Sequence, residues 1–191
     1  MSVGQHARRF LAVVVLVGSL ATTASAAPSP PTLYRRLLVQ PFPVAQLPSS
    51  LRSPARLSRL DTAALARFEG ALGGVRVTLS KGPSTIDYVI FPTHAEALAA
   101  WLARVEDHES GDQQSWAASD TTPVLPTPSR LYLGLEFFGG GQRLTTLAFF
   151  VDGPALIEAT TTVTAAAVHY NKANTVTLAR VAHAHLLEVE R

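Results

Sequence analysis

The amino-acid sequence predicts an α+β domain in which an antiparallel sheet of about six strands carries three helices, packed mainly on one face. Two pairs of apolar segments are joined by turns that contain Gly-Pro, at positions 82–83 and 153–154, and short hairpins favour antiparallel pairing. Three further segments repeat apolar residues at helical spacing: 62–72, the residues after Thr93, and 175–189. Each of these helices has one apolar face, so together they can cover one side of a sheet.

The beginning of the domain is predicted to be extended or irregular. Residues 27–32 are rich in proline and predict a linker, after which a single domain is expected over residues 33–191. Residues 33–40 predict a strand that Pro41 ends. Residues 47–60 predict irregular structure, because prolines interrupt them.

Local signals define the first helix and the first hairpin. Asp61 is the expected N-cap of helix 62–72, and the glycine pair at 73–74 is its expected end. The hairpin that follows has predicted strands at 75–79 and 86–91. The second of these is apolar at nearly every position, which is typical of a central strand.

The second helix has the clearest start in the chain. Thr93 and Glu96 have the spacing of a capping box, and the buried stripe is predicted to consist of Leu98, Trp101, Leu102 and Val105. Residues 107–129 are polar and rich in turn residues. A connection of this length is usually a functional loop or a disordered segment.

The C-terminal half repeats the succession of elements seen in the first half. Leu-Tyr opens a predicted strand at 33–34 and another at 131–132, and each half ends in a hairpin and a helix. A pseudo-duplicated unit of strand, hairpin and helix is therefore a hypothesis. A ferredoxin-like βαββαβ core with an added hairpin and helix is the alternative. The strands predicted in this half are 130–138, 142–151 and 155–163.

The first 26 residues have the organisation of a removable export signal. Arg8-Arg9 precedes an apolar run at 10–20, and the small residues Ala24-Ser25-Ala26 offer a cleavage site after Ala26. The apolar run is shorter than the roughly 20 residues that cross a bilayer core. The sequence therefore predicts a secreted, periplasmic or cell-envelope protein with no transmembrane anchor after cleavage. Both general secretion and twin-arginine export fit these residues.

Charge and cysteine content exclude several function classes. The formal charge of +2 resides in Arg8 and Arg9, because the rest of the chain has as many basic as acidic residues. Nucleic acid is therefore not an expected partner. The chain has no cysteine, so thiol catalysis, zinc–thiolate sites and disulfides are excluded.

Charge is also divided along the chain. Basic residues dominate residues 35–81 and acidic residues dominate 82–136. Either the two parts face each other or remain solvated, or the basic part contacts an anionic surface.

No catalytic, cofactor-binding or metal-ligating residue is predicted. His183 and His185 lie two positions apart, which on a helix turns them to opposite flanks, so they do not clamp one ion. Asp87 and His94 are the residues on which a secreted hydrolase would depend, in combination with a serine. The sequence contains no G-x-S-x-G elbow.

The C-terminal part resembles known exported proteins. It has an apolar strand from Leu144, then Asp152-Gly153-Pro154, a second strand at 155–159 and a closing helix with Leu178-Ala179. In this it is similar to small exported bacterial proteins of unknown function and to the extracellular sensor domains of bacterial serine/threonine kinases. Those sensor domains carry a disulfide in this region, which a chain without cysteine does not share.

The resemblance implies binding or sensing instead of catalysis. The expected function is that of an exported, non-catalytic binding protein whose partner is a small apolar envelope molecule or another protein. The stripe from Leu131, with Phe149 and Phe150 opposite, is expected to belong to the core, and an apolar groove that the helices leave uncovered is the expected ligand site. A secreted hydrolase that uses His94 and Asp87 is the alternative.

Overall fold

The computed structural model describes residues 27–191 with the exception of 81–82, 111–115, 120–124, 139–140 and 165–167. The predicted export signal, residues 1–26, lies outside the described residues. Within the described part the strands form one sheet, in the order β1-β2-β3-β7-β6-β5-β4. Every neighbouring pair is antiparallel, which confirms the α+β class with an antiparallel sheet. The strands are β1 (Ala55–Arg59), β2 (Gly73–Leu79), β3 (Ser84–Ile90), β4 (Trp116–Ser119), β5 (Ser129–Phe138), β6 (Gly141–Asp152) and β7 (Ala155–Thr164).

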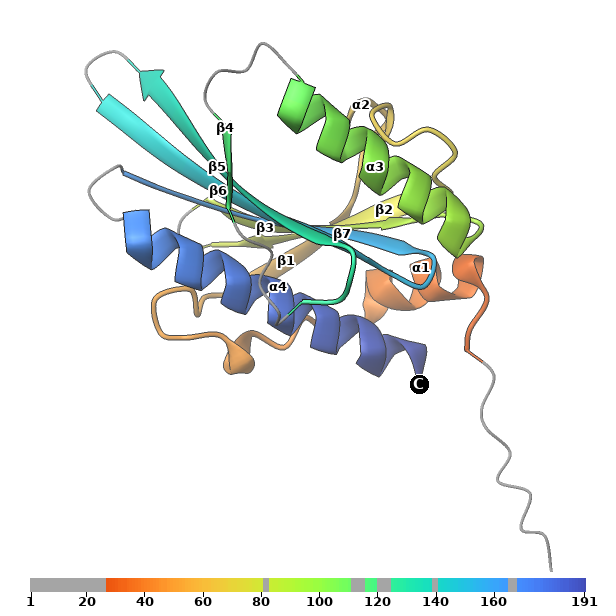
Figure 1. The fold of residues 1–191 in the computed structure, drawn as a ribbon. Helices are drawn as coiled ribbons and strands as arrows, with labels where there is room; N and C mark the ends of the chain where they lie inside the picture. Colours follow the sequence, from red (N-terminus) through yellow and green to blue (C-terminus); the bar gives the residue numbers. More distant parts are fainter. Residues whose placement is uncertain (1–26, 81–82, 111–115, 120–124, 139–140, 165–167) are drawn as a thin grey trace, which may run out of the picture.

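Helices lie on both faces of the sheet, which corrects the prediction that they gather mainly on one. Figure 1 shows α3 on one side and α4 on the other. The physical reason is that β3 is buried on both faces. Val89 and Ile90 point in opposite directions and both are fully buried, so each face needs a cover. The helices are α1 (Pro30–Val39), α2 (Thr62–Leu65), α3 (His94–Ser110) and α4 (Val168–Glu190), with a 3₁₀ turn, η1, at Val44–Gln46.

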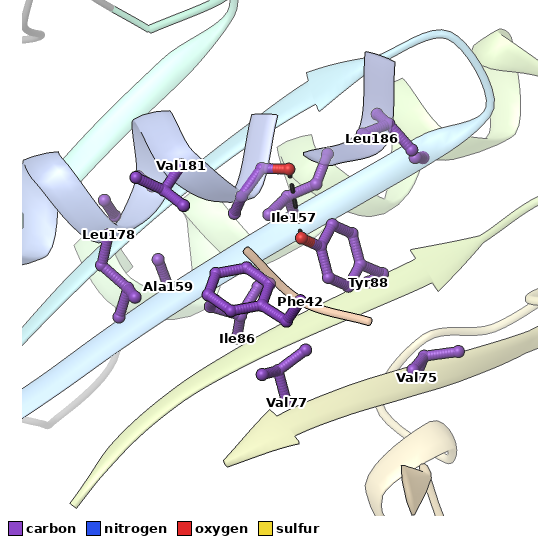
Figure 2. Packing of buried hydrophobic residues seen from close by; sticks show 14 of the residues in the cluster. Phe42, Val75, Val77, Ile86, Tyr88, Ile157, Ala159, Leu178, Val181 and Leu186 are labelled. Carbon is purple, nitrogen blue, oxygen red and sulfur yellow. Dashed lines mark hydrogen bonds between the residues drawn. The ribbon is translucent and has the colours of Figure 1, made fainter. Parts of the chain in front are cut away.

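The face under α1 and α4, here called the α4 face, is closed by an apolar core. Ile86 and Ile157 of the central strands pack against Leu178 and Leu186 of α4, as Figure 2 shows. Tyr88 is fully buried in this core and its hydroxyl donates a hydrogen bond to the carbonyl of Ala182, 3.1 Å away. Burial raises the pKa of Tyr88 well above its usual value of 10.0, so the phenol stays protonated and retains this bond.

The opposite face, here called the α3 face, has a separate and smaller core. Trp101 of α3 and Phe68 pack over Phe149 and its neighbours on the sheet. Thr93 caps α3 as predicted, since the Glu96 amide donates to the Thr93 hydroxyl at 3.2 Å and this hydroxyl donates to Oε2 of Glu96 at 2.7 Å. Leu102 does not belong to the buried stripe, because 55% of it is exposed; the buried partner of Trp101 on this helix is Ala97.

The segment 33–40, predicted as a strand, is helical in α1 up to Val39, and Gln40 is the extended C-cap. The helix begins at Pro30, inside the predicted linker, because proline is well tolerated in the first turn of a helix. Leu33 and Leu37 are buried at a spacing of four residues, and Tyr34 and Leu38 pack beside them. This i, i+1, i+4, i+5 pattern is helical, and it was misread as a strand pattern.

The segment between α1 and β2 also differs from expectation. Part of the predicted irregular region forms the edge strand β1, which pairs with β2. Helix α2 starts at its predicted N-cap, as Asp61 accepts a 2.7 Å hydrogen bond from the Ala64 amide, but it has a single turn. The glycine pair at 73–74 begins β2 instead of ending a helix. Both glycines are closely covered, Gly73 by the ring of Tyr34 and Gly74 by Leu60, so neither position has room for a Cβ atom.

The predicted loop at 107–129 is partly regular. Helix α3 continues to Ser110 and β4 occupies residues 116–119, while 111–115 and 120–124 lie outside the described residues. Leu125 is buried in the core of the α4 face. The predicted strands of the two hairpins, and those at 130–138, 142–151 and 155–163, are present with shifts of a few residues at their ends.

The predicted duplication does not hold in its original form. The segment predicted as the first strand of the repeat is helix α1. The two helices that should correspond, α3 and α4, cover opposite faces of the sheet. A two-fold axis along the sheet normal would keep both helices on one face. What the halves do share is a three-stranded meander, β1-β2-β3 and β5-β6-β7, followed by a helix. This order also differs from that of a ferredoxin-like core, because consecutive strands within each meander are neighbours.

The turn between β6 and β7 is attached to both helix layers. Nδ1 of His94, in the first turn of α3, lies 2.8 Å from the Gly153 carbonyl. On the other face Nε2 of His183, in α4, lies 2.8 Å from Oδ2 of Asp152. Glu190 is close by, and burial together with the charge of Asp152 raises its pKa. The turn therefore connects the ends of α3 and α4.

Substitutions in α1 distinguish the helix from the predicted strand. Leu37 is fully buried and Val39 is 78% exposed; two positions apart, they would share a face in a strand. We expect Leu37→Ala to lower the free energy of unfolding by about 2–5 kcal/mol and Val39→Ala to change it by less than about 0.5 kcal/mol, measured by urea unfolding. Similar losses for both variants would contradict the helix.

Candidate functional site

A row of charged residues crosses the α3 face at the centre of the sheet. Asp87 of β3 and Glu158 of β7 are register partners, and on their outer sides they pair in register with Arg76 of β2 and Phe149 of β6. Both carboxylate side chains are only 5% exposed. Side chains at directly opposed positions have Cβ atoms roughly 5 Å apart, so two buried negative charges lie side by side. We refer to Asp87 and Glu158 as the carboxylate pair.

Arginines from three different elements neutralise the carboxylate pair. Arg76 binds Asp87 through two hydrogen bonds, donated by Nε at 2.7 Å and by Nη2 at 2.6 Å. Arg104 of α3, whose side chain is 11% exposed, donates from Nε to Glu158 at 2.9 Å. Arg67, just after α2, reaches both carboxylates at 3.5 and 3.8 Å. Charge-assisted pairs of this kind offset the cost of burying carboxylates.

These residues line a pocket of about 300 Å³, here called the charged pocket. Besides the three arginines and the carboxylate pair, it is lined by His108, Leu147 and three threonines, Thr85, Thr145 and Thr160. Thr85 and Thr160 are register partners one row beyond the carboxylate pair, and Leu147 follows them on β6. The charged pocket therefore lies between the flank of α3 and the centre of the sheet.

His108 closes one side of the charged pocket as a neutral group. Its ring packs edge-on against Tyr132 and Phe149, with centroids 5.0 and 5.8 Å away. Burial, followed by the positive charge of Arg104, lowers the pKa of His108 from 6.5 to about 4. Tyr132 donates a 2.8 Å hydrogen bond to Glu109, and burial and this bond raise the pKa of Tyr132.

The structure does not bring Asp87 and His94 together. Asp87 is buried in the sheet and accepts hydrogen bonds from Arg76, whereas His94 is exposed and contacts the Gly153 carbonyl. Ile90, three positions after Asp87, pairs with Ala155 next to that turn. Three strand residues rise about 10 Å, so the side chains of Asp87 and His94 lie in different parts of the α3 face. The hydrolase alternative therefore lacks its acid–histidine pair.

The other residues considered in the sequence are part of the body of the fold. His183 lies on the flank of α4 beside Asp152, but His185 is fully buried, with its Nδ1 3.1 Å from the Tyr88 hydroxyl. Leu131, Phe149 and Phe150 are at most 1% exposed, so they belong to the core, as expected, and line no apolar groove. Among the described residues there is no group of three or more His, Cys, Asp or Glu that could hold a metal ion.

Sequence reasoning missed Glu158 and the three arginines, although signals for them were present. Asp87 and Glu158 each interrupt a strand that is otherwise apolar, and a charge at such a position needs a buried partner. The basic and acidic parts of the chain do face each other here, through Arg67 and Arg76 against Asp87. Which arginine pairs with which carboxylate depends on β2, β3 and β7 being neighbours in the sheet. Only the tertiary structure determines that order.

The two arginines that reach Glu158 are expected to differ in their contribution to stability. Arg104→Met removes the buried partner of a buried carboxylate, so we expect the free energy of unfolding to fall by about 3 kcal/mol or more. Arg67 is 42% exposed and contacts the carboxylate pair at long range, so Arg67→Met should cost less than about 1 kcal/mol. Urea unfolding of both variants tests this, and equal losses would contradict the assigned pairing.

His108 should make stability fall in mildly acidic solution. In the unfolded chain His108 takes up a proton below about pH 6.5, whereas in the folded protein its pKa is about 4. Its contribution is therefore complete above pH 6.5 and is lost as the pH falls toward 4, by at most about 3 kcal/mol. We expect His108→Gln to flatten the dependence of unfolding free energy on pH in this window. Leu102→Gln, at an exposed position of the same helix, should retain it; an unchanged slope in His108→Gln would refute this origin.

The chain was compared with protein families, curated proteins and solved structures. No protein-family model and no curated protein matches the chain. Among solved structures, the extracellular domain of PknH from Mycobacterium tuberculosis is similar, with 14% sequence identity and a TM-score of 0.46 over 72% of this chain and 78% of that one. In the described part of the chain, no helix is long and apolar enough to span a membrane.

Proposed function

We propose that this is an exported, non-catalytic binding or sensing protein that acts in the cell envelope or outside the cell, and that it binds a small polar molecule in the charged pocket. The charged pocket is the observation that carries the proposal. A volume of about 300 Å³ is at the lower end of the range for small-molecule sites. Arg76, Arg104 and the carboxylate pair are held in place by their ion pairs and by the sheet, which preorganises most of the binding site.

The chemistry of the lining supports binding over catalysis. Each carboxylate accepts hydrogen bonds from a guanidinium group, which holds it as a fixed negative charge. The lining histidine is neutral and packs against aromatic rings, and the lining hydroxyls belong to threonines. A hydrolase would need a base within hydrogen-bond reach of a nucleophile, and the Asp87–His94 pair expected for that role is separated.

The polarity of the charged pocket changes the expected ligand. An apolar envelope molecule would have to desolvate guanidinium and carboxylate groups without replacing their hydrogen bonds, which is unfavourable. A polar molecule can replace them. Export is supported by Arg8-Arg9, the apolar run and the small residues up to Ala26.

Native mass spectrometry of the chain recovered from the culture medium and envelope fraction tests the function. We expect a polypeptide that begins at Ala27 and carries a non-covalently bound small molecule. In Arg67→Gln the occupied fraction should fall about ten-fold or more, while Arg180→Gln, an exposed position on α4, should retain it. An uncleaved chain inside the cell would refute export, and a bound molecule that Arg67→Gln leaves in place would refute this site.

A further inference from the structure

We propose that the charged pocket binds a small oxyanion, that is, a carboxylate, phosphate or sulfate group of a small molecule, held by Arg67 and Arg76. This inference deepens the proposed function and rests on it for the location of the site. It adds the chemical class of the ligand and the residues that contact it.

Arg76 has donors that its ion pair leaves unused. It binds Asp87 through Nε and Nη2, which occupy one edge of the planar guanidinium. The two N–H groups of Nη1 take no part in that pair. The side chain is 35% exposed and lines the charged pocket. A guanidinium with a free edge is suited to a planar or tetrahedral oxyanion.

Arg67 is the arginine that can turn toward a ligand. Its Nη2 is 3.5 Å from Asp87 and 3.8 Å from Glu158, both longer than a charge-assisted hydrogen bond. Its guanidinium carbon lies 5.1 Å from the centre of the Phe68 ring, which supports the group without using its N–H donors. Arg76 and Arg104 continue to hold the carboxylate pair when Arg67 moves, so its reorientation leaves no buried carboxylate without a partner.

The charge of the lining favours an anion over a cation. Three guanidinium groups face two carboxylates, and His108 is neutral, so the lining has an excess of one positive charge. Asp107 lies 3.6 Å from Arg104 but is 67% exposed and does not line the charged pocket, where solvent screens it. Hydroxyls of Thr85 and Thr160 add donors one row from the carboxylate pair. A bound monoanion would neutralise the excess.

Arginine side-chain NMR of the purified chain tests the inference directly. Sodium sulfate, sodium phosphate and sodium acetate are titrated separately against sodium chloride at equal ionic strength, and the Nε–Hε resonances are followed. Variants of Arg67 and Arg76 assign their signals. We expect saturable shifts of these two resonances with at least one oxyanion and none at Arg180; comparison of sulfate and phosphate with acetate identifies a tetrahedral or a planar ligand group.

Two variants and a control separate a binding role from a structural one. Arg67→Gln should weaken the affinity for the active oxyanion about ten-fold or more, with an unchanged circular dichroism spectrum. Thr160→Val, which keeps all charges, should weaken it several-fold. Arg180→Gln should leave it unaltered.

The outcomes also distinguish this inference from the proposed function. Shifts no larger than those with chloride, or shifts with methylammonium chloride in place of the oxyanions, would overturn oxyanion binding. If the chain from the culture carries a molecule that is lost in Arg67→Gln but no oxyanion binds, the function stands and the ligand class is wrong. If oxyanions bind but the chain is not exported, the ligand class stands and the function is wrong.

Discussion

Two carboxylates buried side by side in the middle of a sheet have to be neutralised, and much of the α3 face follows from this requirement. Asp87 and Glu158 repel each other across neighbouring strands, a repulsion that low dielectric surroundings increase. The guanidinium groups that compensate it come from β2, from the segment after α2 and from α3. Each of these elements is thereby attached to the centre of the sheet by a charge-assisted contact, which is more directional than the apolar contacts around it.

The two faces of the sheet consequently differ in what they can do. On the α4 face, apolar side chains from α1, α4 and the strands fill the space, and even Tyr88 and His185 are buried there. On the α3 face the apolar residues of β3 and β7 stop at the charged row, whereas on β5 and β6 the core continues past it through Tyr132 and Leu147. Beyond the charged row, threonines replace apolar residues on β3 and β7, and the charged pocket opens there. The same ion pairs therefore end the core and shape the site.

The elements that local chemistry determines could be predicted from the sequence, whereas the site could not. The capping box at Thr93 and the N-cap at Asp61 depend on residues three positions apart, so both were found. Leu33 and Leu37 fit a helix as well as a strand when only a few residues are considered, and the prolines before them were read as a linker. The division of helices between the two faces of the sheet depends on whether a strand is buried on one face or on both. That burial depends on the elements that pack against the strand in the folded chain. Asp87 was singled out with the wrong partner because Arg76 faces it across the β2–β3 pair, while His94 is merely near in sequence.

The attachment of the β6–β7 turn has a consequence for protein engineering. Hairpin tips are ordinarily good places for inserted epitopes, fusion partners or circular permutation, because few contacts depend on them. Here His94 reaches the tip from one side of the sheet and His183 reaches it from the other. A peptide spliced between Asp152 and Gly153 would separate the two acceptors and loosen the helices on both sides together, so this short, half-buried turn is a poor insertion point.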